Sequence, residues 1–183
     1  MLEISAEQEI SAEFVRDWAD KYDKHFKGKK DETDEKAIRE WLSRQSEPKR
    51  LNRDFFVKLG CWKSARQRPA YKANDERLIE EATRLAYEVT NERIKLHILK
   101  VLNGVQVAVA STILHFLQPD TFAIFDIRVR RSLKKAGKWD RDENVASDEA
   151  WQEYIALMRN LSSSLGVTLR ELDKALWAYD KWG

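Results

Sequence analysis

Residues 102–131 read LNGVQVAVASTILHFLQPDTFAIFDIRVRR, and in this stretch a glycine separates two apolar patterns of helical period, the first of which begins a few residues upstream. The apolar positions recur every three or four residues on both sides of the glycine: Ile94, Ile98, Val101 and Leu102, then Val107, Ala110, Ile113, Leu114 and Leu117. Such spacing is typical of helices that bury one face. The stretch therefore predicts two short helices joined by a turn at residues 103–106.

The turn, Asn103-Gly104-Val105-Gln106, directly precedes the second helix. The first N–H groups of a helix have no partner within it, and they suit an anion such as a phosphate. Contacts of this kind would hold DNA without reading its sequence. We therefore expect Asn103, Gly104, Val105 and Gln106 to bind DNA. Glycine also ends helices for purely structural reasons, so a plain connecting turn is the alternative.

A single aspartate follows the second helix. Asp126 lies 22 residues after Gly104 and just before the helical pattern Val129, Leu133, Ala136. The carboxylate is therefore expected at the start of a helix, where aspartate commonly accepts a backbone N–H bond as the N-cap residue. A cap and a catalytic role are compatible, and the sequence leaves both open.

With its glycine turn, Pro119 and Asp126 in this order, the segment resembles the helix-hairpin-helix base-excision DNA glycosylases. The resemblance covers about a third of the chain. In that family the hairpin binds the phosphates of damaged DNA, the base is flipped into a cleft, and an aspartate assists cleavage of the glycosidic bond. The resemblance implies that Asp126 is the catalytic carboxylate, which would stabilise the cationic sugar or orient a water.

The chain departs from the family pattern in three respects. Gln106 stands where the hairpin usually has a second glycine, so its side chain could crowd a phosphate or hydrogen-bond to it. Ala108 stands where bifunctional members carry a nucleophilic lysine, which argues against a lysine Schiff-base lyase. Cys61 is the only cysteine, too few for an iron–sulfur cluster. We expect no metal and no cofactor, and a monofunctional glycosylase that uses Asp126 and a water.

Two basic runs without acidic residues lie on either side of the turn in the sequence, over residues 58–72 and 127–139. The net charge of +2 does not by itself indicate nucleic-acid binding, but clustered bases bind a polyanion through counterion release. We expect DNA contacts from one group of these residues: Lys63, Arg66, Arg68, Arg128 and Arg131. A solvated basic surface is the alternative. For Trp62, within the first run, a place in the core is favoured over base stacking.

The composition favours an all-α fold, because a chain with 35% charged residues, six glycines and three prolines is typical of helical proteins with salt-bridged surfaces. At 183 residues we expect one compact unit, 1–183. The resemblance implies a two-lobed helical fold, with residues 74–138 forming the lobe of the hairpin and aspartate. Residues 1–73 and 139–183 would then form the second lobe from both chain ends.

Further helix signals lie outside this segment. Helices are expected over 13–22 and 35–44, joined by an exposed connection over 27–35. Asn74 is expected to cap the helix of Leu78 and Ile79, Ser147 to cap a later one, and Thr168–Glu171 to form a capping box. His115 lies on an apolar helix and is expected to be a hydrogen-bonded core residue without a catalytic role.

No apolar leader or apolar run of membrane-spanning length is visible, so we expect a cytoplasmic protein without a membrane partner. Two other functions compete with that of a DNA glycosylase. One is a non-catalytic helix-hairpin-helix protein that binds nucleic acid through the basic runs. The other is a helical protein-interaction module, in which Gly104 and Asp126 serve only as turn and cap residues.

Overall fold

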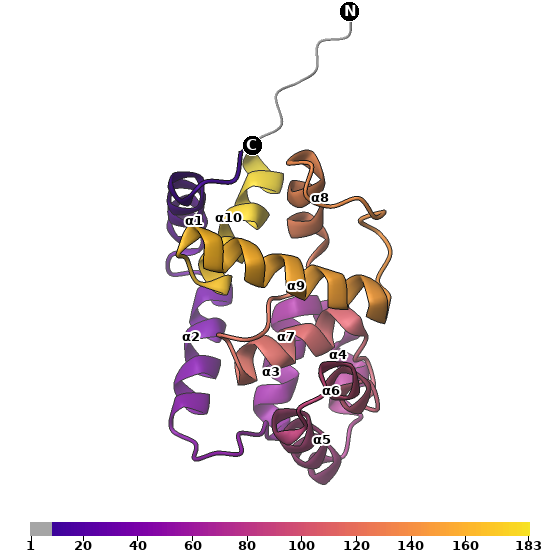
Figure 1. The fold of residues 1–183 in the computed structure, drawn as a ribbon. Helices are drawn as coiled ribbons and strands as arrows, with labels where there is room; N and C mark the ends of the chain where they lie inside the picture. The colour runs from indigo at the N-terminus through magenta and orange to yellow at the C-terminus, as the bar shows by residue number, and fades with distance from the viewer. Residues whose placement is uncertain (1–8) are drawn as a thin grey trace, which may run out of the picture.

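The computed structural model describes residues 9–183, and the predicted all-α fold is confirmed, because these residues form helices and no strand (Figure 1). In chain order the helices are α1 (Ala12–Phe26), α2 (Lys30–Ser43), α3 (Arg53–Ser64), the short 3-10 helix η1 (Ala65–Gln67), α4 (Arg68–Lys72), α5 (Glu76–Glu88), α6 (Glu92–Leu99), α7 (Val107–Leu117), α8 (Ile127–Lys135), α9 (Asp148–Leu165) and α10 (Leu169–Trp182). None of them is long and apolar enough to span a membrane.

The last helix, α10, lies between helices from distant parts of the chain: it packs along α1 and along α8 (Figure 1). At the other end of the molecule α5 packs on α6, while α3 contacts α2, α4 and α7. Helices from the beginning, middle and end of the sequence thus pack together around α10. The division into lobes 74–138 and 1–73 plus 139–183 stays a prediction.

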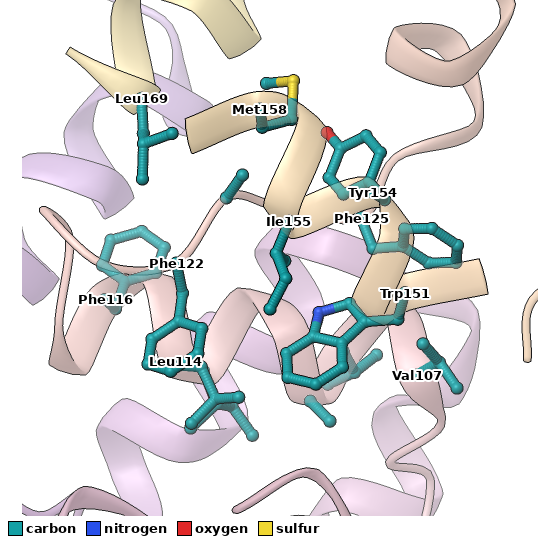
Figure 2. Close-up of a cluster of buried hydrophobic side chains, with 14 of the residues drawn as sticks. Val107, Leu114, Phe116, Phe122, Phe125, Trp151, Tyr154, Ile155, Met158 and Leu169 are labelled. Carbon is teal, nitrogen blue, oxygen red and sulfur yellow. The ribbon is translucent and has the colours of Figure 1, made fainter. Parts of the chain in front are cut away.

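Helix α7 lies at the centre of the fold. Every residue of α7 except Ala108 is buried, which explains why this helix is apolar nearly all round. Figure 2 shows α9 lying across it, with Trp151 and Ile155 directed toward Leu114 and its neighbours. Ser111 of α7 accepts a hydrogen bond from the backbone N of Phe125 at 2.9 Å. The segment that leads to Asp126 is therefore fixed to the central helix.

The predicted turn between two helices is confirmed, but the buried face of the first helix was assigned only partly correctly: Leu102 is buried and Ile98 packs against the core. Ile94 and Val101 are 49% and 58% exposed, whereas Leu96 and Leu99 are completely buried. The spacing of the apolar residues did not identify this face fully because it treats lysine as exposed, whereas Lys95 is buried. Its ammonium donates to the backbone O of Ala86 and Tyr87 at 2.8 Å and to Oε1 of Gln118 at 3.0 Å. A lysine thus occupies part of the face expected to be apolar.

Two helix boundaries differ from expectation. Helix α2 begins at Lys30, so the connection predicted over 27–35 is shorter; acidic residues in the first turn favour this earlier start. Helix α5 is capped by Asp75, whose Oδ1 accepts from the N–H groups of Arg77 and Leu78, and Asn74 is buried against the turn before α7. The caps predicted at Ser147 and at Thr168–Glu171 are confirmed.

Candidate functional site

Asp126 is the N-cap residue of α8, as predicted. Its Oδ1 accepts a hydrogen bond from the backbone N of Arg128 at 2.9 Å. Its Oδ2 accepts from the ammonium of Lys63, which comes from the end of α3. The two side chains are only 19% and 11% exposed. One oxygen of Asp126 thus serves the helix, and the other forms an ion pair with a residue 63 positions earlier in the chain.

The environment of Asp126 favours its charged form. Burial acts to raise the pKa of the carboxyl, but the nearby charge of Lys63 and the hydrogen bonds from Lys63 and Arg128 outweigh it. The pKa of Asp126 is therefore below its ordinary value. At neutral pH the site holds a carboxylate that is available to stabilise a developing positive charge.

Asp126 and Lys63 line a pocket of about 170 Å³. Four aromatic rings from α1, α3 and α10 form part of its wall: Tyr22, Phe26, Trp62 and Trp177. Two further charged side chains of α10, Arg170 and Asp173, lie in the same wall. The pocket therefore combines apolar surfaces, which suit a planar ring, with a small number of charged groups.

Asp173 differs from Asp126 in its environment. The residue is 3% exposed, and its Oδ2 accepts from Arg170. Its Oδ1 is buried without a hydrogen-bond partner in the described part of the chain. Burial is the main cause that raises the pKa of Asp173 to about 6, with the negative charge of Asp126 adding to it. The pocket thus pairs a carboxyl group with a lowered pKa, Asp126, with one that loses its proton only near pH 6, Asp173.

A buried network of charges fixes the wall formed by α10. Arg170 donates to Glu35 of α2, with 2.6 Å between Nη2 and Oε2, and Glu35 also pairs with Arg39. Arg39 lies 3.0 Å from Nε2 of His115, whose Nδ1 is 2.7 Å from the backbone O of Phe122. Burial, together with Arg39, lowers the pKa of His115 to about 3, so the ring is neutral. The prediction of a hydrogen-bonded core histidine is confirmed.

In the turn before α7, Gly104 adopts the left-handed conformation, with a φ of +82°. Asn103 and Gln106 are exposed, whereas Val105 is buried and donates its N–H to the O of Leu102 at 3.1 Å. Gln106 has an extended backbone and makes no side-chain bond to the start of α7. Its position therefore requires no second glycine, and the first N–H groups of α7 are left without a side-chain cap.

A single ring lies against both this turn and α3. A Cβ atom added at Gly104 would come within 2.9 Å of the Tyr71 ring, and one added at Gly60 within 2.7 Å of the same ring. Tyr71 itself is completely buried. The two glycines are therefore required because a side chain at either position would collide with Tyr71.

The five basic residues that were predicted to contact DNA fall into two groups. Arg66, Arg68 and Arg131 are exposed. Lys63 pairs with Asp126, and Arg128 pairs with Asp180, with 3.1 Å between Nη1 and Oδ2. The first group is free to meet a large anion in solution, whereas the second is already engaged in ion pairs at and beside the pocket.

Trp62 was expected in the core; it packs against the core but is not enclosed by it. The residue is half-buried and lines both the pocket of Asp126 and an adjacent cavity of about 440 Å³ that also reaches Arg68. Its Nε1 donates to the backbone O of Asp31 at 3.0 Å. The Trp62 ring also packs on Phe116 in a T-shaped arrangement, with 5.5 Å between the ring centroids.

Sequence reasoning did not find the contributions of Arg170 and Asp173. A signal was present, because Asp173 interrupts the apolar stripe Leu169, Leu172, Leu176 of the last helix. In the part of the chain that the structure describes, no group of three or more histidine, cysteine or acidic side chains could hold a metal ion.

The comparison with protein families gives a match over residues 11–177, nearly the full length of the chain. The matching family model is described as "OGG: Putative 8-oxoguanine DNA glycosylase OGG-like protein". No curated protein and no solved structure matches the chain.

Proposed function

The chain belongs to the family of OGG-like proteins described as putative 8-oxoguanine DNA glycosylases, and on this premise we propose that it removes a damaged or modified base from DNA. The reaction is cleavage of the N-glycosidic bond, with Asp126 as the catalytic carboxylate. The observation that carries the proposal is the ionised Asp126 in a pocket walled by four aromatic rings.

Departure of a base leaves positive charge on the sugar, spread over C1′ and the ring oxygen. A fixed carboxylate beside that charge lowers the barrier because it is stabilising mainly in the transition state. Asp126 is held in place by the N–H of Arg128 and by Lys63, so little reorganisation is needed when the charge develops. A water oriented by the same carboxylate would complete hydrolysis in a monofunctional enzyme.

The pocket wall supports binding of an extruded base. Flipped bases commonly stack between aromatic side chains and are read through their polar edges. Trp62 and Trp177 offer such surfaces, and the unpartnered Oδ1 of Asp173 offers a hydrogen bond to an edge of the base. Among base lesions, 8-oxoguanine is the first candidate because the family description names it.

Binding of the DNA backbone is proposed at the turn of Asn103, Gly104, Val105 and Gln106 and at exposed arginines. The uncapped start of α7 and its dipole favour a phosphate there. Arg66, Arg68 and Arg131 extend the positive surface. Lys63 contributes at the pocket itself, where Asp126 holds it, and Arg128 contributes beside the pocket, where Asp180 holds it.

The test is base release from a duplex with one 8-oxoguanine, compared with undamaged DNA and duplexes carrying other lesions. Asp126→Asn is the informative variant because asparagine caps a helix as well as aspartate does but carries no charge. We expect a loss of base release of about 100-fold or more, with DNA binding retained. If Asp126→Asn releases the base as fast as the unmodified protein, Asp126 is only a cap.

A second candidate, DNA binding without catalysis, is favoured by one observation: both oxygens of Asp126 already have partners. It predicts salt-sensitive binding that does not distinguish damaged from undamaged duplexes, and no base release from any of them. Arg66→Glu combined with Arg131→Glu should then weaken binding strongly. Unchanged affinity in this double variant would exclude that surface from DNA binding under either function.

A further inference from the structure

We propose that Asp173 is the acid that protonates the departing base, and that Glu35 of α2, acting through Arg170, sets the pH range over which Asp173 holds this proton. The inference rests on the proposed function, because it assigns a second catalytic group to the same bond cleavage. Asp126 faces the positive charge that develops on the sugar, whereas Asp173 removes the negative charge that develops on the base. Two carboxyl groups of one pocket thus deal with the two charges of the transition state.

The hydrogen bonds of Asp173 place its proton on one oxygen. Arg170 lies one turn earlier on α10, and its Nη1 donates to Oδ2 of Asp173. Because Oδ2 accepts from a guanidinium, which cannot itself accept, Oδ1 carries the proton of the neutral acid. Oδ1 is buried and has no hydrogen-bond partner within residues 9–183, although Asp173 lines the pocket. A nitrogen or carbonyl oxygen of a bound base supplies the partner that this acid lacks in the free protein.

Two neighbouring carboxyl groups with different affinities for a proton can serve as acid and as charge stabiliser in one site. The two groups of this pocket differ in this way. Lys63 donates to Asp126, so Asp126 is held in its charged form. Burial raises the pKa of Asp173 to about 6, and the negative charge of Asp126 adds to this. Near pH 6 a proton is therefore available at Asp173 beside an ionised Asp126.

Glu35 governs how strongly Arg170 acts on Asp173. Both oxygens of Glu35 accept from Arg170, at 3.0 Å from Nε and 2.6 Å from Nη2, whereas Asp173 accepts only from Nη1. Burial acts to raise the pKa of Glu35, but Arg170 outweighs it and lowers the pKa to about 2, so Glu35 is ionised. Its negative charge offsets the positive charge of Arg170, which favours the ionised form of Asp173. Neutralising Glu35 should therefore make Asp173 lose its proton at a lower pH.

Other charged or titratable groups act on Asp173 from the helices around it, and they are Asp126, Lys63, Tyr22 and Tyr154. The pKa of Asp126 is below its ordinary value. Burial raises the pKa of Tyr22 to about 12 and that of Tyr154 well above its ordinary value. These two tyrosines and Asp126 therefore keep their charge between pH 5 and pH 8. A loss of base release over this range that disappears in a variant of Asp173 reports the proton at Asp173.

Protonation of the base completes a balanced hydrolysis. Asp173 gives its Oδ1 proton to a ring nitrogen or carbonyl oxygen of the base as the C1′–N bond breaks. The electron pair of that bond stays with the base, which leaves as a neutral molecule. Water adds to the positively charged C1′ and loses a proton to Asp126, from which the proton passes to solvent. Asp173 then recovers a proton from solvent.

The experiment measures single-turnover base release between pH 5 and pH 8 from a duplex with one 8-oxoguanine, or with whichever lesion the protein releases. The protein is in an excess that saturates the duplex at each pH, which separates bond cleavage from DNA binding. Four proteins are compared: the unmodified chain, Asp173→Asn, Glu35→Gln and Asp34→Asn. Asparagine at position 173 keeps an acceptor for Arg170 but has no acidic proton. Asp34→Asn is the matched control, because it neutralises another buried carboxylate of α2 that pairs with Lys58 and does not line the pocket.

We expect base release by the unmodified protein to fall about tenfold per pH unit above pH 6, because one proton is required. Asp173→Asn should be about 100-fold slower at pH 6 and independent of pH. Glu35→Gln should move the midpoint of the fall to lower pH and slow release at pH 7 by about threefold to tenfold. Asp34→Asn should keep the midpoint of the unmodified protein. If Asp173 instead bound the base as a carboxylate, release would rise with pH.

The acid role of Asp173 is overturned if release by the unmodified protein stays flat or rises from pH 5 to pH 8, or if Asp173→Asn keeps the fall. Either result, with base release intact, leaves the proposed function standing. An unmoved midpoint in Glu35→Gln overturns the role of Glu35. Absence of base release from every lesion at every pH removes the proposed function together with this inference. The profile of the unmodified protein requires no variant, so the test holds even if Asp173→Asn fails to fold.

Discussion

The side-chain amide of Asn74 forms hydrogen bonds with both the backbone N–H and the backbone C=O of Asn103. Oδ1 of Asn74 accepts from the N of Asn103 at 2.7 Å, and Nδ2 donates to the O of Asn103 at 3.1 Å. Asn74 is 2% exposed, so these bonds are shielded from water. The turn before α7 is therefore shaped by a residue 29 positions earlier in the chain, before any ligand is present.

Replacing Asn74 should destabilise the protein through this turn. Asn74→Ala removes both bonds and takes these partners from the N–H and C=O of Asn103, so we expect a loss of about 1–3 kcal/mol in the free energy of unfolding. Urea denaturation measures it. Asn144→Ala, at an exposed asparagine, is the control and should change stability by no more than about 0.5 kcal/mol. Equal effects of the two changes would contradict this role of Asn74.

Gly104 and Gly28 form a matched pair for separating backbone strain from collision. Both have positive φ, +82° and +74°, but a Cβ at Gly104 would meet Tyr71 whereas one at Gly28 has nothing within 4 Å. Gly28→Ala should cost on the order of 1–2 kcal/mol for the left-handed conformation alone. Gly104→Ala should cost a further 1–3 kcal/mol or so, because the core must shift to admit the methyl group. Thermal or urea unfolding of the two variants tests the difference, and similar losses would show that Tyr71 yields freely.

Gln106 permits a test of phosphate binding at the turn. Gln106→Ser and Gln106→Asp both supply the missing N-cap, so each should stabilise the protein by about 0.5–1 kcal/mol. Only the aspartate adds a negative charge where a phosphate is proposed to bind. DNA affinity at low salt should therefore fall in Gln106→Asp and remain near that of the unmodified protein in Gln106→Ser. Equal affinities would exclude a phosphate at this helix start.

Asp173 should make stability depend on pH in a defined direction. Its pKa is about 6 in the folded protein and 3.8 as the reference value, so the folded state holds the proton more tightly. The group therefore costs stability above pH 6, and this cost disappears as the pH falls toward 3.8. Asp173→Asn removes the titration, so its stability relative to the unmodified protein should rise between pH 4 and pH 7 by up to about 3 kcal/mol. Urea unfolding across this range measures the difference between the two proteins.

The contribution of His115 runs in the opposite direction and is common to both proteins in that comparison. Its pKa is about 3 in the folded state and 6.5 as the reference value, so its contribution to stability is lost as the pH falls below 6.5. Because it is the same in both proteins, it cancels in the difference. A difference between the two proteins that stays flat from pH 4 to pH 7 would contradict the raised pKa of Asp173.

Local patterns predicted those parts of the fold that depend on neighbouring residues. Asp126 as a cap, the capping box of Thr168 and Glu171, and the turn at Gly104 all follow from short-range chemistry. The buried face of α6 did not, because the periodicity argument treats every lysine as exposed and Lys95 is buried beneath the end of α5.

For a similar reason, the sequence predicted one residue of the candidate site but not the residue that pairs with it. The spacing from Gly104 pointed to Asp126, but its ion pair with Lys63 depends on where the end of α3 lies relative to the start of α8, which no local pattern encodes. A lysine on another helix can reach the same carboxylate once the chain is folded, and Lys63 does so.

The ring of Tyr71 acts as a spacer of fixed thickness. It separates Gly104, in the turn proposed to hold a phosphate, from Gly60, three residues before Lys63 on α3. Neither glycine has a side chain that could change conformation. The distance between the backbone of the turn and the backbone of α3 is therefore set by the size of the rigid Tyr71 ring. In the proposed function, a strand anchored at the turn would thus present its sugar at a constant depth to Lys63 and Asp126, whatever the sequence of the DNA.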